Sequence, residues 1–324
     1  MTTFLYSHDA SLHHVTPEGH PERVDRIRAI NRVLASPHFK DLIRREAPLA
    51  RDEDILRAHA PGHLNRVRAI APEAGFEYLD ADTAMSPGSL EAALRASGAA
   101  TAAVDAVFRG EADNAFCAMR PPGHHAESRR AMGFCFFNNA AIAALYARER
   151  YDAERVAVVD FDVHHGNGTR EIFYSDPGLF YGSTHQMPLY PGTGSSQETG
   201  VGNIFNAPLR AGDGGEQFRE AMSTLILPAL DVFAPDLVII SAGFDAHHRD
   251  PLGSLRLTEE DFAWATLQLM EAAEIHAGGR VVSVLEGGYD LQGLAASVGI
   301  HVQALMRGNA DEAADPDEFD EDEL

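Results

Sequence analysis

The sequence of 324 residues contains few cysteines and no long apolar run. Its two cysteines, Cys117 and Cys135, form no CxxC motif, which excludes a disulfide framework and a cysteine-based zinc knuckle. Such cysteine usage is typical of a reducing compartment. Because no stretch of about 18 apolar residues occurs, we expect no membrane span and no membrane partner. The first residues lack the basic start and apolar stretch of a signal peptide, so we expect a cytoplasmic protein.

Basic residues are also scarce. The chain has 26 Lys and Arg against 49 Asp and Glu, which gives a formal net charge of −23. Nucleic-acid-binding proteins normally carry a basic face, so we expect no binding to DNA or RNA. Residues 310–324 hold nine acidic residues and no basic one. Such a block is typical of a solvated, disordered tail, so we expect a single domain over residues 1–309 followed by this tail.

The sequence is rich in alternating helix and strand patterns. Apolar residues recur at three- and four-residue spacing, which predicts helices, over residues 22–35, 87–109, 138–150, 214–232, 258–277 and 290–307. Between them lie apolar runs at 114–119, 155–161, 179–184, 236–243 and 280–288. Because these runs do not alternate with polar residues, they are typical of strands covered on both faces. The pattern predicts an α/β fold, a three-layer open parallel sheet with helices on both faces.

Titratable side chains follow several predicted strands at the point where each strand ends. They are His124 and His125, then Asp160, Asp162, His164 and His165, then Asp245, and last Tyr289. Ligands of open α/β sheets bind beyond the carboxyl ends of the strands. We therefore expect these groups to converge on one functional site.

The stretch AVVDFDVHHGNGT, residues 157–169, contains a candidate metal site. If the strand remains extended, Asp160, Asp162 and His164 point to one side and His165 to the other, so we interpret His165 as structural. Asp162, His164 and Asp245 would offer three ligands and an open position, which is typical of catalytic zinc. Iron or cobalt would accept the same set. One of the two aspartates alone would also suit a turn cap, but the whole cluster favours a metal.

The tandem histidines His124 and His125 follow a rigid Pro-Pro-Gly turn. Adjacent side chains point in different directions, so we expect two distinct roles. Asp160 and Asn167 are the natural partners that would set the tautomers of the two rings. Tyr289 follows two glycines and either packs in the interior or faces the metal, where its hydroxyl would stabilise an oxyanion.

Seven motifs together resemble the zinc-dependent histone deacetylase family, and most of all its class II and bacterial amidohydrolase branch. They are GHPERVDRI, RPPGHHAE, MGFCFFNNAA, VVDFDVHHGNGT, LYPGTG, SAGFDAHHRDPLG and LEGGYD. The likeness runs from about residue 8 to residue 305. It implies the arginase–deacetylase fold, which agrees with the helix and strand pattern.

The resemblance implies specific catalytic roles. It makes His125 the general base and His124 an electrostatic helper or acid. It pairs Asp160 with His124 and Asn167 with His125. It assigns Tyr289 to the scissile carbonyl.

The resemblance also implies metal sites. The zinc ligands would be Asp162, His164 and Asp245. One structural potassium site maps to Asp160, Asp162, His164, Ser183 and Thr184, partly through carbonyls. A second potassium site maps, again largely through carbonyls, to Phe173, Asp176, Leu179 and Asn203.

A narrow acyl-lysine channel is a further implication of the resemblance. Its lining and rim would include Gly133, Phe134, Tyr190, Leu252, Gly288 and Asp80. Asp80 would match a rim aspartate that holds the substrate backbone, and Arg26 an arginine of an inner channel behind the metal. The family usually has Phe where Tyr190 stands, so we expect a wetter channel wall.

The expected activity is hydrolysis of N-acyl amides, with acyl-lysine in peptides or proteins as substrate. An acetylpolyamine amidohydrolase is the alternative. Leu252 stands where polyamine-selective relatives place a glutamate and cannot pair with a second ammonium, whereas the acidic chain would attract a polyamine. A catalytically silent binding protein would have lost a ligand or Tyr289, and none is lost.

Two further enzyme classes fit the sequence less well. An arginase-like enzyme would need more carboxylates for a two-metal cluster. A serine hydrolase is disfavoured because no GxSxG motif occurs. A homo-oligomer is compatible with the sequence.

Overall fold

Eight strands, all parallel, form the central sheet within residues 1–308, the part of the chain that the computed structural model describes. Their order is β2-β1-β5-β10-β9-β6-β7-β8. The strands are β1 (Thr3–Ser7), β2 (Ile43–Glu46), β5 (Asn114–Cys117), β6 (Val156–Asp160), β7 (Leu179–Gln186), β8 (Ile204–Leu209), β9 (Leu237–Ala242) and β10 (Val281–Leu285). A separate antiparallel hairpin consists of β3 (Glu77–Asp80) and β4 (Thr83–Met85). The acidic tail predicted for residues 310–324 lies outside the described residues.

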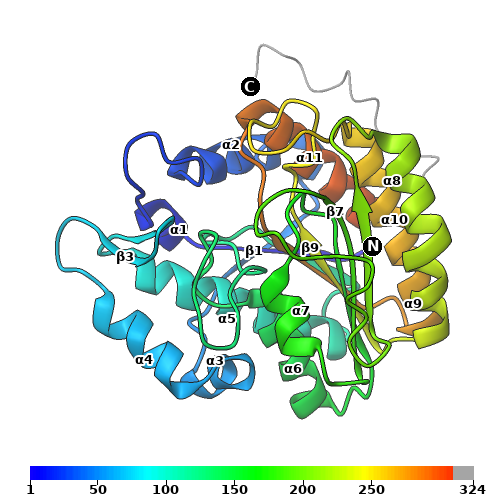
Figure 1. Cartoon of the computed structure of the whole chain (residues 1–324), viewed down its shortest axis with the longest axis horizontal. Helices are drawn as coiled ribbons and strands as arrows, with labels where there is room; N and C mark the ends of the chain where they lie inside the picture. The colour runs from blue at the N-terminus through cyan, green and yellow to red at the C-terminus, as the bar shows by residue number, and fades with distance from the viewer. Residues whose placement is uncertain (309–324) are drawn as a thin grey trace.

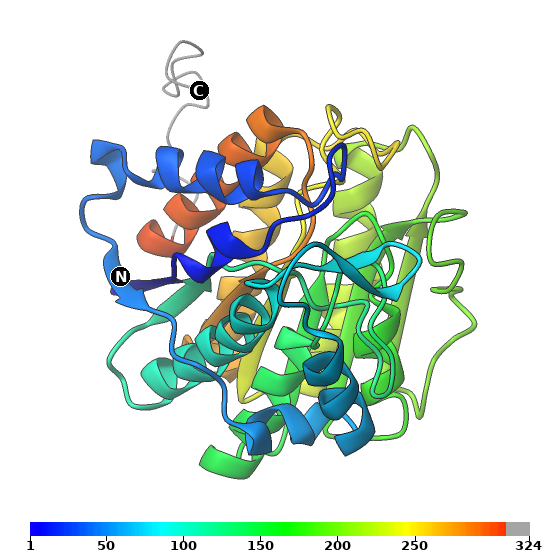
Figure 2. The ribbon, with the colours of Figure 1, turned by 90° about the vertical axis from the view of Figure 1, so that its left-hand side faces the viewer.

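Helices cover both faces of the sheet (Figure 1). One face carries α2 (Val24–Leu34), α8 (Gly215–Ala221), α9 (Leu227–Phe233), α10 (Glu259–His276) and α11 (Leu291–Arg307). The other carries α3 (Asp52–Ala58), α4 (Pro61–Ile70), α5 (Ser89–Phe108), α6 (Asn139–Tyr151) and α7 (Asn167–Phe173). Figure 2 shows α2, in blue, lying beside α11, in orange-red. Short turns form α1 (Ala10–His13), the 3₁₀ turn Pro37–Phe39 and the π-helical turn Met222–Ile226.

The central strands are apolar on both sides because both sides are buried. Val156 and Val158 of β6 pack into the core under α5 and α6. Ala157 and Val159 of the same strand pack into the core under α10 and α11. Alternate residues of a strand point to opposite faces, so a doubly covered strand needs an uninterrupted apolar run. The predicted three-layer α/β architecture is confirmed.

The six predicted helices correspond to α2, α5, α6, α8 with α9, α10 and α11, with ends within two residues of the expected ones. Side-chain caps explain two starts. Asn138 accepts a hydrogen bond from the N–H of Ala141 at α6, and Asp290 accepts one from Gly293 at α11. The long pattern over 214–232 is interrupted by the π-helical turn between α8 and α9. No helix within residues 1–308 combines the length and apolarity needed to cross a bilayer.

The strand order explains why the polar loops meet. Strands β5, β10, β9 and β6 are neighbours in the sheet and all run in the same direction. The loops that follow them therefore emerge at one edge of the sheet. These loops carry the tandem histidines, Tyr289, Asp245 and the Asp162–His164 segment, in that order across the sheet.

Candidate active site

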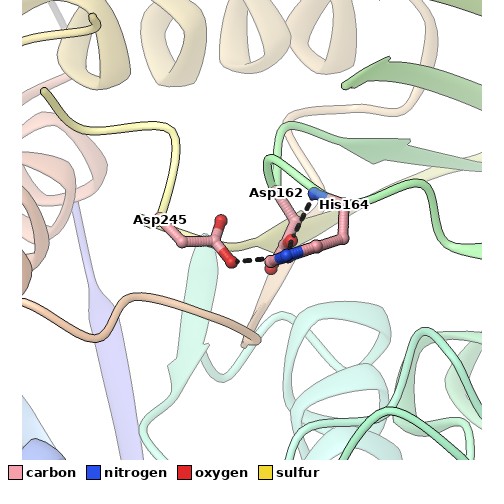
Figure 3. Close-up of side chains that lie close together, drawn as sticks. All are labelled: Asp162, His164 and Asp245. Atoms are coloured by element: carbon pink, nitrogen blue, oxygen red, sulfur yellow. Dashed lines mark hydrogen bonds and ion pairs between the residues drawn. The ribbon is translucent and has the colours of Figure 1, made fainter. Parts of the chain in front are cut away.

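Asp162, His164 and Asp245 face one another at the carboxyl edge of the sheet (Figure 3). The ligand atoms that they offer all lie within 4.8 Å of one another, and all three residues are buried. His164 Nδ1 lies 3.1 Å from Asp162 Oδ1 and 3.0 Å from Asp245 Oδ2. Two carboxylates and one imidazole at this spacing fit a zinc ion that keeps a coordination position for water or substrate.

The chain positions these ligands by a turn, not by an extended strand. β6 ends at Asp160, and residues 162–164 form a bend. The N–H of Asp162 donates to Asp160 Oδ1 at 3.1 Å, and the N–H of His164 donates to Asp162 Oδ1 at 2.9 Å. The premise that the extended conformation continues is therefore wrong. The side chains of Asp160 and Asp162 are thus each oriented by the backbone N–H two residues further along.

The two metal-facing carboxylates are each held by a backbone N–H from another segment. Val163 donates to Asp245 Oδ1 and Gly287 donates to Asp162 Oδ2, both at 2.8 Å. A Cβ atom at Gly287 would lie 2.2 Å from Asp245 Oδ2 and 2.6 Å from Asp162 Oδ2. Only glycine permits this close approach, so the LEGGYD motif contributes directly to the site.

His125 is oriented as a neutral base. Its Nδ1 lies 2.9 Å from Asn167 Oδ1, while Asn167 Nδ2 donates to Glu127 Oε1 at 2.8 Å. Because a carboxylate only accepts hydrogen bonds, Glu127 assigns the amide orientation, which puts the proton of His125 on Nδ1. Nε2 is then free to take a proton. Burial and the neighbouring imidazoles of His124 and His164 hold the pKa of His125 well below its usual range.

His124 has the opposite electrostatic setting. Burial alone would lower its pKa, but the carboxylates of Asp162, Asp160 and Glu286 raise the pKa well above its usual range. Its Nδ1 lies 3.0 Å from Asp160 Oδ2, which also accepts a hydrogen bond from the Tyr181 hydroxyl at 3.0 Å. The two ring centroids of His124 and His125 are 4.1 Å apart. The tandem pair thus places a protonated imidazole, His124, beside a neutral one that can accept a proton, His125.

Glu286 is a buried residue of the site that the sequence reasoning missed. Its Oε2 accepts the backbone N–H groups of Gly123 at 2.7 Å and His124 at 3.1 Å. Its Oε1 accepts the Ser241 hydroxyl at 3.0 Å. Burial raises the pKa of Glu286 to about 7. Its place in the LEGGYD motif, directly after a buried strand, was the signal that pointed to it.

Tyr289 is anchored through its backbone and its ring. Its N–H donates to Asp250 Oδ2 at 2.6 Å, and the guanidinium of Arg26 lies 4.9 Å from the ring centroid. Arg26 Nε also donates to the carbonyl of Gly288 at 2.5 Å. Burial and the Asp245 carboxylate raise the pKa of the Tyr289 hydroxyl well above its usual range, so it remains a hydrogen-bond donor.

Aromatic rings flank the approach to these groups. The ring of Phe134 lies 6.0 Å from Tyr289, and the ring of Tyr190 lies 5.2 Å from His125. Tyr190 is 40% exposed, so this side is open to solvent. Gly133 packs directly on His125, where a Cβ would lie 2.4 Å from the ring.

The predicted rim residue Asp80 is engaged by another side chain. Asp80 Oδ2 accepts a hydrogen bond from Arg130 at 2.8 Å. Asp82, which the sequence reasoning did not single out, accepts the N–H of Gly133 at 3.1 Å and so borders the channel more directly. Leu252 lies near Tyr289, because its N–H donates to Oδ1 of the same Asp250.

His165 lies outside the metal-facing group. Its Nδ1 lies 2.7 Å from the Thr193 hydroxyl, and its ring centroid is 4.8 Å from that of His185. Burial lowers the pKa of His165 to about 2, so it stays neutral. These contacts are those of a packed structural side chain.

Comparison with known proteins identifies the family. A family model described as the histone deacetylase domain matches residues 20–305. The chain belongs to the histone deacetylase family. A histone deacetylase-like amidohydrolase of Pseudomonas aeruginosa is 44% identical over 277 residues, which cover 84% of this chain and 73% of that protein. A probable deacetylase of Archaeoglobus fulgidus is 37% identical, with 95% and 87% covered.

The fold of a solved structure agrees with this membership. The crystal structure of the HDA15 HD domain matches with a TM-score of 0.90 and 35% identity, and the match covers 96% of this chain and 91% of that one. The predicted arginase–deacetylase fold is confirmed. The chain is a hydrolase of the deacetylase and amidohydrolase class.

The first potassium site that the family implies fits the residues present. Asp160 of β6 and Ser183 of β7 are neighbours in register, and both are fully buried. The hydroxyl oxygen of Thr184 is buried and makes no hydrogen bond within residues 1–308. A buried carboxylate beside hydroxyl and carbonyl oxygens suits a monovalent cation.

The second implied potassium site does not fit a cation in the same way. The carbonyls of Phe173, Asp176 and Leu179 do converge, but they converge on the side-chain nitrogen of Asn203. A cation could bind these carbonyls only if that amide moved away.

Proposed function

We propose that the protein is a zinc-dependent amidohydrolase that removes acetyl or other acyl groups from N-acylated amines, above all from acyl-lysine in peptides or proteins. The observation that carries the proposal is the Asp162–His164–Asp245 group next to the tandem histidines, with the rings of His125 and His164 centred 5.9 Å apart. A zinc ion held there supplies Lewis acidity to the amide carbonyl and to the attacking water.

The residues of the chain divide the proton transfers between them. His125 accepts the proton of the attacking water at Nε2, since its Nδ1–H is engaged with Asn167. The Tyr289 hydroxyl donates a hydrogen bond to the oxyanion that forms. His124, whose proton is stabilised by Asp160, donates this proton to the leaving amine. The proton that His125 took from the water then restores His124, so both histidines regain their starting states.

We further propose that one structural potassium ion binds beside Asp160 and Ser183. Such an ion would neutralise the buried Asp160 carboxylate and so stabilise the neighbouring strands β6 and β7, where Asp160 and Ser183 pair. This ion takes no part in the proton transfers described above.

The substrate class is tested with the metal-loaded protein and three groups of compounds: acetyl-lysine peptides, longer acyl-lysine peptides and acetylpolyamines. Release of the free amine is measured for each. Leu252 at the rim offers no carboxylate to a second ammonium, which favours acyl-lysine. Faster turnover of acetylpolyamines would reassign the substrate, and no turnover with zinc bound would favour a silent binding protein.

A further inference from the structure

Three backbone carbonyls meet at the start of β7. They belong to Phe173, the last residue of α7, to Asp176 in the following turn, and to Leu179, the first residue of β7. Their oxygens lie 2.9, 3.0 and 2.7 Å, respectively, from Nδ2 of Asn203. Rings of backbone carbonyls of this kind are ligand sets for potassium. Here an amide nitrogen lies at the point where they converge.

The surrounding loop holds the Asn203 amide in one orientation. Its Oδ1 accepts the N–H of Val201 at 3.1 Å, so Nδ2 must face the carbonyls. Gly200 has a φ of +58°, and a Cβ there would lie 2.5 Å from Asn203 Oδ1. The backbone of Asn203 is also held against β7, because the N–H of Tyr181 donates to the Asn203 carbonyl at 3.0 Å. The side chain is buried, with the residue only 4% exposed.

The charge around this cluster is already balanced without an ion. The Asp176 side chain forms an ion pair with Arg148 and also accepts the N–H of Gly178. Two of the three carbonyls already accept a backbone N–H, that of Phe173 from Asp176 at 3.0 Å and that of Asp176 from Leu179 at 3.1 Å. The neutral amide supplies two further N–H groups to the cluster, so each carbonyl is satisfied without a charge. At the first potassium site, by contrast, the Thr184 hydroxyl is buried and makes no hydrogen bond within residues 1–308, so an oxygen ligand remains there for a cation.

We propose that the side-chain amide of Asn203 takes the place of a second structural cation, so that the folded chain holds one monovalent cation rather than two. The amide ties the end of α7, the turn after it and the start of β7 together. This connection does not depend on the potassium concentration. The number of bound cations does not depend on which substrate the protein hydrolyses.

The direct test is the anomalous signal of thallium(I), a heavy stand-in for potassium, in crystals of the full chain. We expect a peak beside Asp160 and Ser183 and none among the carbonyls of Phe173, Asp176 and Leu179. A peak among these carbonyls, with the Asn203 amide turned away, would overturn the proposal.

A variant pair provides a second test in solution. Asn203→Ala removes the amide nitrogen, so its melting temperature should fall by several degrees in choline chloride and recover largely in potassium chloride, as a cation enters the carbonyl cluster. Asn206→Ala is the matched control, since Asn206 is also buried and donates to two loop carbonyls, those of Ser195 and Glu198. We expect no potassium-specific recovery for that control. Equal responses of the two variants to potassium would contradict the proposal.

Discussion

Buried histidines stand in two contrasting regions of this protein. At the carboxyl edge of the sheet, burial would lower the pKa of His164, but hydrogen bonds to Asp162 and Asp245 raise the pKa to about 10. In the helix layer, His301 of α11 lies between the hydroxyls of Thr266 and Ser283, at 2.7 and 2.9 Å, and burial lowers its pKa to about 3.

This contrast shows that the partners of a buried imidazole decide what it does. Both His164 and His301 are shielded from water. Two carboxylates demand a positive charge at His164, which either a proton or a metal ion can supply. The two hydroxyls carry no charge and do not stabilise a protonated ring, so His301 stays neutral and has a structural role. Substitutions at the carboxyl edge of the sheet should therefore strongly affect zinc binding and turnover. A substitution in the helix layer should affect only stability, and less strongly.

The largest effect should come from Asp245→Asn, which removes one of the two carboxylates that face His164. We expect the zinc content to fall well below one per chain. Turnover should fall by at least the roughly 10²–10³-fold that losing a single oxyanion donor costs. Asp231→Asn, at an exposed acid on α9, is the matched control and should change neither quantity. Metal analysis measures the zinc content and amine release measures turnover. Full zinc occupancy in Asp245→Asn would show that this carboxylate is not needed to hold the metal.

Tyr289→Phe should have the next largest effect, because it removes only the hydroxyl that donates to the oxyanion. We expect kcat to fall by roughly 10²–10³-fold while zinc stays bound. Steady-state kinetics and metal analysis on the same preparation measure the two quantities. Unchanged kcat would show that Tyr289 only packs against Arg26.

Glu286 offers a smaller and more discriminating change. Glu286→Ala removes the acceptor of the Gly123 and His124 N–H groups, so kcat should fall by roughly 10- to 100-fold with little change in KM. Glu286→Gln keeps a carbonyl oxygen for both N–H groups and an amide for Ser241, so it should restore most of the rate. If Gln were as slow as Ala, orientation of the tandem histidines would not be the role of this residue.

The smallest effect concerns pH and stability at His301. Its pKa is about 3 in the folded protein and about 6.5 in an unfolded chain. As the pH falls below 6.5, only the unfolded chain takes up the proton, so stability falls, by roughly 2 kcal/mol from this group at pH 5. His301→Gln should weaken the pH dependence of the free energy of unfolding, measured by urea denaturation at pH 7.5 and 5. An unchanged pH dependence would contradict the neutral state of His301.

The parts of the molecule that follow from local sequence were predictable. In α5 and α10 the helical periodicity, and in β6 and β9 the uninterrupted apolar run, show within the segment itself which residues are buried. The strands β1, β2 and β8 and the β3–β4 hairpin did not stand out, because their apolar runs are very short or are interrupted by charged residues or proline, as in IRRE of β2 and IFNAPL of β8.

The ligand cluster was predictable because polar residues at strand ends are conspicuous in the sequence. Contacts between distant segments were not. Glu286 reaches Gly123 across 163 positions, and Glu127 reaches Asn167 across 40. The bend after Asp160 could not be predicted from the alternation of apolar and polar residues either. The strand ends there because the Asp160 side chain accepts a hydrogen bond from the N–H of Asp162.

Amide hydrolysis by this protein should require a metal held by Asp162, His164 and Asp245. The most direct test follows zinc content and acetate release from an acetyl-lysine peptide in one preparation, first as loaded, then after chelation, then after zinc is returned. We predict one zinc per chain, loss of turnover with the metal, and recovery of both together. Turnover that persists after the metal has been removed would contradict the claim.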